Sequence, residues 1–400
     1  MEQVIQKIEN VDPTQLKNAY EKAAYFADWV YLKKPGNTLV SPMSLNMALG
    51  LAAEGASGET AKELAQYLGR EDYSGYVDEY MRFMESLTKE RNGQEATDEE
   101  MDGKKLLSLR DDGYSFRFEI ANSLWINEKK QIQENYRNNV EKLFRAKVSP
   151  ADFTNDPSKT VDIINQWCKE KTHDLIPSII TSRDIDPDLA AILINSLYFE
   201  SPWVDKWSLK EHTFKNFSGE ETTQEMLFGK GDAYYENDQA IAFSKAYYNG
   251  FQFIGILPKE EGEFNVLDLD LESLLNSKTN EYLVTALMPK LNFSSTADEL
   301  QTLLKSEGIM APFDTSCAQF DKIIEGEELH ISRILQKCKI ELDENGTKAA
   351  AVTAVMMRTN GALAIDQERK EVYLDRPFAF MIYDSRNDEI VFVGKVTEAE

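Results

Sequence analysis

The longest apolar stretch of the chain, from Leu189 to Phe199, constrains its fold more than any other segment. The run has the length of a strand, and only Asn195 and Ser196 interrupt its apolar character. A strand without polar alternation is buried on both faces, like the central strand of a covered sheet. The run is too short to cross a membrane as a helix, which takes about 18 apolar residues or more. We therefore predict a sheet built around this segment, and no membrane partner.

Before this strand, several segments have apolar residues at helical spacing, and one segment among them alternates between apolar and polar residues. Helices are predicted over residues 13–32, 43–53, 57–68, 133–144 and 158–172. Ser57 is expected to cap the third helix, and Gly69 to follow its last turn. A long strand is predicted where residues of one parity are apolar, which are Phe116, Phe118, Ile120, Leu124 and Ile126.

Strands dominate the second half of the chain. β-branched and aromatic residues broken by glycines predict several antiparallel strands over residues 213–258. A strand over 283–293 and a helix over 296–306 follow, and then strands over 334–342, 372–375, 379–383 and 390–396. A cluster of acids predicts an exposed excursion over 88–113. No repeat, linker or abrupt change of composition divides residues 1–400, so we predict a single α+β domain.

The charge balance excludes several kinds of partner. Lys and Arg number 44 against 69 Asp and Glu, which gives a formal net charge of −25. A chain this acidic is a poor partner for nucleic acid, and it shows no basic patch of the kind that binds heparin. Three cysteines, Cys168, Cys317 and Cys338, are too few and too scattered for a disulfide framework. We expect them to be free, buried thiols.

No pattern of catalytic residues stands out, so we do not expect an enzyme. The segment Gly55–Glu59 departs from GxSxG at its last position, and no strand is predicted before it. The histidines, His173, His212 and His330, form no HExxH and no i, i+4 pair. Neither GxGxxG nor GxxxxGK[ST] is present. We therefore predict no metal and no cofactor.

The segment from Ile340 to Ile365 is the one passage that these patterns do not explain. Its alanines and methionines are typical of a helix, and Asn345-Gly346 is typical of a two-residue hairpin turn. Parity suggests a third interpretation. The odd positions from Thr347 to Thr359 are uncharged, whereas Lys348 and Arg358 fall on even positions. With a period of two, such a segment can become a strand with one buried and one wet face.

These residues and several others resemble the serpin family. Residues 344–353, ENGTKAAAVT, are similar to the hinge of a serpin reactive loop. Further similar blocks lie in the order of the family, from about residue 15 to 397. They are the segment from Asn37 to Gly69, Asn165-Gln166-Trp167 with Thr172, LINSLYFESPW ending at Trp203, TALMPKLNF, GIMAPFD, DRPFAFMIYD and VFVGKV. An ordered set is far more specific than one short motif, and the chain is identified as a member of this family, of a prokaryotic-like type.

The resemblance implies a fold and an activity. The fold is one α+β domain with about nine helices, three mostly antiparallel sheets and an exposed reactive loop at about residues 344–370. The activity is inhibition of a serine protease by a metastable suicide substrate, and serpin loop insertion is a known conformational switch. The protease cleaves the loop, and the cleaved loop then inserts into the central sheet and traps the acyl-enzyme. The expected partner is a trypsin-like, elastase-like or subtilisin-like protease, in a covalent 1:1 complex with a monomer.

The resemblance also assigns residues of the loop. Its hinge comprises Glu344, Gly346, Thr347, Ala349, Ala350, Ala351 and Thr353. Fifteen positions counted from Gly346 place the reactive bond between Asn360 and Gly361. Alternatives stay open, because asparagine is uncommon there and neighbouring residues each suit a common protease. These alternatives are Thr359, Arg358, Met357 and Met356.

In this family, polar residues under the central sheet form a shutter, and the end where the loop enters is the breach. The matching residues are Ser41, Ser44, Asn195, Trp203 and Gln336. Gln336 departs from the family pattern, which commonly has a histidine seven residues before Asp343. Glutamine can donate and accept hydrogen bonds but cannot titrate. We therefore expect mild acid to have little effect on sheet opening through this site.

Two other functions stay open, a non-inhibitory serpin (carrier, chaperone or storage protein) and an inhibitor of cysteine proteases. Thr347 favours inhibition, because a charge at the first inward position would oppose insertion, and this residue is small and neutral. We expect an extracellular, secreted protein whose mature chain lacks its signal, with the cytoplasm as the alternative.

Overall fold

The apolar run forms strand β4 (Ala191–Pro202), and every residue of this strand is buried. The computed structural model describes residues 2–69, 77, 81–83, 117–326, 328–347 and 367–399. β4 belongs to a six-stranded sheet with the order β11-β12-β13-β4-β2-β3, which we call the central sheet. Its other strands are β2 (Arg117–Asn127), β3 (Lys147–Ala151), β11 (Leu291–Ala297), β12 (Arg333–Leu342) and β13 (Gly346–Thr347).

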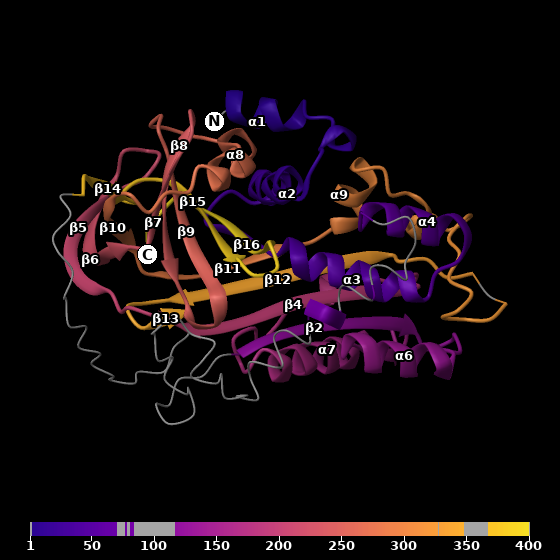
Figure 1. The fold of residues 1–400 in the computed structure, drawn as a ribbon. Coiled ribbons are helices and arrows are strands. Elements are labelled where there is room, and N and C mark those ends of the chain that lie inside the picture. Colours follow the sequence, from indigo (N-terminus) through magenta and orange to yellow (C-terminus); the bar gives the residue numbers. More distant parts are fainter. Residues whose placement is uncertain are drawn as a thin grey trace, which may run out of the picture.

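Helices cover both faces of the central sheet (Figure 1). α3 (Pro42–Glu54) packs on one face, which we call the inner face, and α7 (Pro157–Lys171) packs on the other. Alternate residues of β4 serve the two sides, so Leu193 joins the core on the α3 side and Ile194 packs with α7. This double cover explains why the sequence of β4 lacks a polar alternation.

Two further sheets complete the fold. One has the order β1-β16-β15-β9-β8-β7 and the other the order β14-β10-β6-β5. Their strands are β1 (Thr38–Val40), β5 (Ser208–Lys215), β6 (Glu221–Gly231), β7 (Ala233–Glu236), β8 (Ala240–Ala246), β9 (Phe251–Pro258), β10 (Leu283–Pro289), β14 (Arg369–Tyr373), β15 (Phe378–Asp384) and β16 (Glu389–Val396). The remaining helices with described bounds are α1 (Glu2–Glu9), α2 (Ala19–Lys33), α4 (Gly58–Tyr67), α6 (Glu134–Phe144), α8 (Leu271–Asn276) and α9 (Leu300–Ser306).

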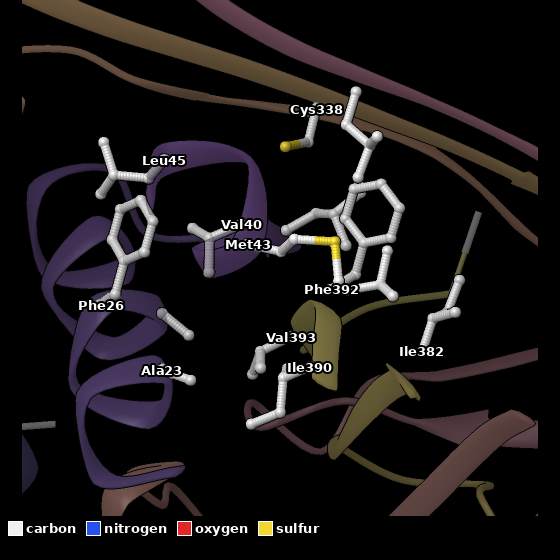
Figure 2. Close-up of a cluster of buried hydrophobic side chains, with 14 of the residues drawn as sticks. Ala23, Phe26, Val40, Met43, Leu45, Cys338, Ile382, Ile390, Phe392 and Val393 are labelled. Atoms are coloured by element: carbon white, nitrogen blue, oxygen red, sulfur yellow. The ribbon is translucent and has the colours of Figure 1, made fainter. Parts of the chain in front are cut away.

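One large core joins α2, α3 and most of the other helices to all three sheets, and a second, smaller cluster packs α7 on the outer face of the central sheet. Figure 2 shows part of the large core, where Met43 of α3 lies next to Phe392 of β16, and Phe26 of α2 lies on the other side of Val40. Cys338 of β12 borders the same cluster from the central sheet. A core shared in this way is the mark of one domain.

The predicted fold class is confirmed. Within the described residues the chain is an α+β domain with helices numbered to α9 and three mostly antiparallel sheets. The exceptions to antiparallel pairing are β12 with β4, β2 with β3 and β10 with β14. The predicted helices 43–53, 133–144 and 158–172 and the predicted strands 334–342, 379–383 and 390–396 agree with the structure to within one residue at each end.

Several local predictions are wrong. The helix predicted over 13–32 begins only at Ala19, after a 3-10 turn at Pro13–Gln15, and α1 had not been predicted. The strand predicted over 283–293 is two strands, because β10 pairs with β6 and β14 in one sheet whereas β11 pairs with β12 in another. The helix predicted from residue 296 starts at Leu300, since Thr296 still belongs to β11.

Two side chains also differ from expectation. Ser57 stands at the N-terminus of α4, but its hydroxyl donates to Asp321 Oδ2 at 2.5 Å and caps no helical N–H. All three cysteines are free, and Cys168 and Cys338 are buried as predicted, whereas Cys317 is exposed. The excursion predicted at 88–113 lies outside the described residues. None of the described helices is long and apolar enough to span a membrane.

Candidate functional site

Strands β4 and β12 run side by side for only part of their length. They pair in parallel from Arg333 with Ile192 to Lys337 with Ser196. At the other end β13 stands between them, where Thr347 pairs with Leu342 and Ser201. The described residues between these two regions, 338–341 of β12 and 197–200 of β4, are not paired with each other. The central sheet is therefore closed at one end and held apart by two residues at the other.

Thr347 points into the protein from this short strand. Its side chain is only 3% exposed, and its Oγ1 is hydrogen-bonded to the hydroxyl of Tyr247 at 2.7 Å. Tyr247 is itself buried, and burial raises the pKa of its hydroxyl well above the usual range. The odd-numbered positions of the segment, counted from Thr347, thus start on the inner face of the sheet.

A tight turn leads from β12 into β13. Asp343 Oδ1 accepts the N–H of Asn345 at 2.7 Å, and the N–H of Asp343 donates to the carbonyl of Gly346 at 2.9 Å. Gly346 has a φ of 155°, a value that residues with a side chain rarely adopt. The structure shows a hairpin here, but its two connecting residues are Glu344-Asn345 and not the predicted Asn345-Gly346, because Gly346 already belongs to β13. The helix is wrong for residues 340–347.

Trp203 holds this turn against the end of β4. Its Nε1 donates to the carbonyl of Asp343 at 2.8 Å, and its backbone N–H donates to the carbonyl of Asn345 at 3.0 Å. Its ring stacks on Tyr247, with 4.0 Å between the centroids. Trp203 and Tyr247 therefore anchor both the backbone of the turn and the side chain of Thr347.

The segment predicted to be exposed over about 344–370 is not exposed throughout. Gly346 and Thr347 are buried, because their backbone lies in the ladder of the central sheet, whereas at the other end Arg369 of β14 is exposed and Lys370 is half-buried. Other predicted residues lie outside the described part of the chain. They are Ala349, Ala350, Ala351 and Thr353 of the hinge, and Met356, Met357, Arg358, Thr359, Asn360 and Gly361 around the reactive bond.

Glu344 in the same turn forms an ion pair across the end of the sheet. Its Oε2 lies 3.0 Å from Lys290 Nζ, and its carbonyl accepts the N–H of Trp207 at 3.2 Å. A hydrogen bond from its own backbone N–H and the nearby Lys290 lower the pKa of Glu344. Because both side chains are about one-third exposed, the pair contributes modestly, about 1 kcal/mol or less.

We expect Glu344→Lys to loosen the entry of β13 into the sheet. The substitution replaces an attraction with repulsion from Lys290 and from Lys206, whose charge also acts on this site. Hydrogen exchange of the Gly346 and Thr347 amides should become about fivefold faster, which corresponds to about 1 kcal/mol. Glu344→Gln should have a smaller effect, and the double variant Lys290→Glu/Glu344→Lys should restore slow exchange. Equal exchange in all four proteins would show that the ion pair does not hold β13.

A row of three amides crosses the inner face where the sheet is closed. Asn122 of β2, Asn195 of β4 and Gln336 of β12 stand in register, and each is at most 1% exposed. Asn195 Nδ2 donates to Asn122 Oδ1 at 2.6 Å, and Gln336 Nε2 donates to Asn195 Oδ1 at 2.7 Å. The row therefore links three neighbouring strands through their side chains.

The amide row rests on the N-terminus of α3. The hydroxyl of Ser41 caps this helix by accepting the N–H of Ser44 at 3.2 Å. Gln336 Oε1 accepts the N–H of Ser41 at 2.9 Å, and Gln336 Nε2 donates to its carbonyl at 2.8 Å. Asn195 Nδ2 donates to the carbonyl of Ser44 at 2.7 Å. The shutter residues named from the sequence thus lie together, with Asn122 as an additional member.

Replacement of Gln336 tests the expectation that the shutter does not titrate. Gln336→His would place an imidazole in a fully buried position, where burial lowers its pKa below the usual value of about 6.5. Such a group contributes stability above its unfolded pKa, and this stability is lost as the pH falls. We expect the variant to lose stability relative to the wild type between about pH 7 and pH 5, by about 1 kcal/mol or more.

The quantity to compare is the difference in free energy of unfolding between Gln336→His and the wild type at each pH. Burial raises the pKa of Asp28 to about 6 and that of Glu307 to about 7, so the wild type has a pH dependence of its own. These raised values make the folded state bind protons more readily, which stabilises it as the pH falls. Denaturant unfolding at several pH values measures both curves. Parallel curves would contradict the prediction for the histidine variant.

Sequence reasoning missed several residues of the site. Asn122 could have been found, because it shares the parity of Phe118, Ile120 and Leu124 and is the polar exception on an apolar face. Tyr247 gave no such indication, since nothing local in the sequence places its hydroxyl beside Thr347. The described residues contain no group of three or more His, Cys, Asp or Glu that could hold a metal ion.

The comparison with protein-family models identifies a family. The model described as Serpin (serine protease inhibitor) matches residues 24–399, which include every described residue of the site. Among curated proteins, the chain is 28% identical over 380 residues to an uncharacterized serpin-like protein of Methanosarcina acetivorans, covering 91% of this chain and 82% of that protein. It is 29% identical to Iripin-2 of Ixodes ricinus, covering 90% of this chain and 88% of the relative.

Solved structures give the same result for the fold. A thermophilic serpin, Tengpin, in the native state superposes with a TM-score of 0.75 at 27% identity, covering 98% of each chain. AtSerpin1 of Arabidopsis, in its native stressed conformation, superposes with a TM-score of 0.77 at 20% identity, covering 97% of this chain and 99% of that one.

Proposed function

The chain belongs to the serpin family, and from this we propose that it inhibits a serine protease as a suicide substrate. Serpins are in general protease inhibitors and not enzymes. The observation that carries the proposal is the position of β13. Gly346 and Thr347 already lie between β4 and β12, where the first residues of an inserted strand would lie.

In the proposed mechanism the protease performs the chemistry and this chain traps the product. The catalytic serine oxygen of the protease attacks the carbonyl carbon of a peptide bond within residues 348–366. The carbon–nitrogen bond breaks, the serine proton passes to the new amino terminus, and an ester joins the two proteins. Water would normally cleave the ester, so inhibition requires that the cleaved loop insert before hydrolysis occurs.

The register of β13 specifies where an inserted strand would run. Thr347 faces Ser201 on one side and Leu342 on the other, both in antiparallel pairing. Each further residue would then face one residue earlier on both neighbours. Residues 348–351 would enter the stretch where β4 and β12 are not paired, and residue 352 would meet the first closed rung, between Lys337 and Ser196.

Thr353 would take the next position, between Asn195 and Gln336. Both amides face the inner side of the sheet, and Thr353 has the same parity as Thr347. Insertion would separate the hydrogen bond between Gln336 and Asn195 and offer a threonine hydroxyl in its place. In this proposal the hydrogen bond between Gln336 and Asn195 is present when the sheet is closed and broken when the sheet has opened.

Insertion is favoured by the backbone pairing that it creates. One parallel ladder between β12 and β4 would be replaced by two antiparallel ladders, one on each side of the new strand. Each net hydrogen bond contributes about 1 kcal/mol. The uncharged odd positions from Thr347 to Thr359 would enter the inner face without an unpaired charge, and Lys348 and Arg358 would face outward.

Incubation with a panel of proteases tests the proposal directly. We expect trypsin-like, elastase-like or subtilisin-like enzymes to give a 1:1 complex that survives denaturing electrophoresis, together with a released C-terminal peptide. Mass measurement of that peptide identifies the reactive bond, for which Asn360-Gly361 is our first choice and the bonds after Thr359, Arg358 and Met357 the alternatives. Cleavage by every protease without any complex would contradict inhibition and favour a non-inhibitory serpin.

A further inference from the structure

A hollow lined by lysines lies at the free edge of the central sheet, next to strand β12, which also carries Gln336 of the amide row. It has two adjoining lobes of about 370 and 550 Å³, and Val30, Lys34, Thr296 and Lys337 line both. β11 is the edge strand of the sheet at this place. The end of α2 forms one wall, and the connection from α7 to β4 forms another through Ser178 and its neighbours. We call this feature the edge hollow.

The charge around the edge hollow is opposite to that of the chain. Lys33 and Lys34 follow one another at the end of α2, and Lys337 and Lys339 lie on the outer side of β12. Four lysines thus line one depression of a protein whose net charge is −25. The carboxylates that line it are Asp184, Asp298 and Glu398.

None of these carboxylates forms an ion pair with the four lysines among the described residues. Asp184 is ion-paired with Arg333 at 3.1 Å, and its other oxygen accepts hydrogen bonds from Thr181. Of the four lysines, only Lys339 has an ion pair among the described residues, with Glu341 at 2.5 Å. Lys337 Nζ donates to the carbonyl of Ser178 at 2.7 Å, which occupies one of its three N–H bonds.

The lysines also oppose one another. Burial lowers the pKa of Lys337, and the charges of Lys34 and Lys339 lower it further. Hydroxyl groups line the same surface, because Thr296 pairs with Lys337 and Ser294 pairs with Lys339 on adjacent strands. Ammonium and hydroxyl donors around an open volume suit an oxyanion with several negatively charged oxygens.

We propose that the edge hollow binds a compact polyanion of the phosphate or sulfate type, held chiefly by Lys34 and Lys337. The sequence showed no basic patch because the lysines come from two segments about 300 residues apart. The site is a hollow and not a stripe, so it accommodates a small multiply charged group and not the backbone of a nucleic acid.

Occupancy would act on sheet opening, a consequence that rests on the proposed inhibitory function. Ser178 lies on a connection held to α7, because Asn165 Oδ1 accepts the N–H groups of Ile179 and Ile180 at 2.8 and 3.1 Å. Lys337 lies on β12, on the last closed rung opposite Ser196 of β4. Lys337 already joins β12 to this connection through the carbonyl of Ser178, so a polyanion that fixes Lys337 in place would hold the two elements together and slow insertion.

Titration calorimetry with pyrophosphate tests the binding site without any protease. The ionic strength is held constant with sodium chloride, so that general screening does not change during the titration. We expect saturable binding to the wild type and at least a tenfold weaker affinity in Lys34→Gln/Lys337→Gln. Lys34→Gln alone, at an exposed position, should weaken binding about threefold or more and guards against a folding defect in the double variant. Lys62→Gln/Lys278→Gln, which removes the same charge elsewhere, should bind like the wild type.

The source of the anion is distinguished by a second ligand. A sulfated disaccharide is titrated under the same conditions, and the tighter of the two ligands identifies the chemistry. Absence of saturable binding for both ligands, or equal binding in Lys34→Gln/Lys337→Gln and the wild type, would overturn the proposal. If pyrophosphate binds but does not slow formation of a protease complex, the anion-binding site is supported and only its effect on opening of the central sheet is refuted. If no protease complex forms at all, the inhibitory function fails and the binding result is unaffected.

Discussion

Thr347→Arg is expected to turn the protein from an inhibitor into a substrate. The wild-type side chain is 3% exposed and hydrogen-bonded to Tyr247, between two strands. An arginine at this position would have to bury an unpaired guanidinium or hold the strand out of the sheet. Burial of an unpaired charge costs several kcal/mol. If about 4 kcal/mol of this cost falls on the insertion barrier, insertion becomes roughly a thousandfold slower.

The measurement is the partition between trapped complex and cleaved protein. With a protease that forms a stable complex with the wild type, the arginine variant should give cleaved chain and active protease. Thr347→Ser keeps the hydroxyl and should still trap, and Thr347→Val tests the contribution of the hydrogen bond to Tyr247. Circular dichroism establishes that each variant is folded before the assay. A denaturant-resistant complex with Thr347→Arg, in wild-type yield, would refute the argument from parity.

Asn195→Ala is expected to produce the largest loss of stability among single substitutions in the shutter. Asn195 is fully buried and bonds to Ser44 below it, Asn122 on one side and Gln336 on the other. Its removal leaves at least two buried polar groups without partners, each at a cost of about 1–3 kcal/mol. We expect the free energy of unfolding to fall by about 3–5 kcal/mol.

A neighbouring residue provides a matched control. Ser196 is also fully buried, but it points to the α7 side, where its Oγ is 3.9 Å from the sulfur of Cys168. Ser196→Ala should cost about 1 kcal/mol or less. Denaturant unfolding and the rate of unfolding measure both variants. Similar losses in the two variants would show that the amide row has no special part in holding the sheet closed.

Local pattern in the sequence was sufficient for most of the fold. The apolar run at Leu189–Phe199 requires cover on both faces, and the alternation from Phe118 to Ile126 requires a half-buried strand, whichever other segments lie nearby. The parity of residues 347–359 likewise depends only on the geometry of an extended backbone. Motif order then pointed to the family, and a family model confirms it.

The wrong predictions concern places where the local sequence pattern does not show that a strand is divided or that a distant residue binds a side chain. Residues 283–293 are continuously strand-like, and only the different pairing of β10 and β11 in two sheets divides them. Ser57 has the residue type of a helix cap, but Asp321 from a distant segment takes its hydroxyl. The choice between such partners depends on which segments meet, and not on the neighbours of a residue along the chain.

The sequence by itself determined which faces of the strands are buried, which polar residues interrupt them and which family the chain resembles. Tertiary structure decided what those polar residues touch. Asn195 and Gln336 are 141 residues apart, and they bond only because β4 and β12 pair in one register. Thr347 likewise meets Tyr247 only because the turn at Glu344-Asn345 returns the chain between two strands. Periodicity is a property of the local backbone, whereas strand register is set by the packing of the whole core. The contacts of the site depend on register, so the sequence alone did not reveal them.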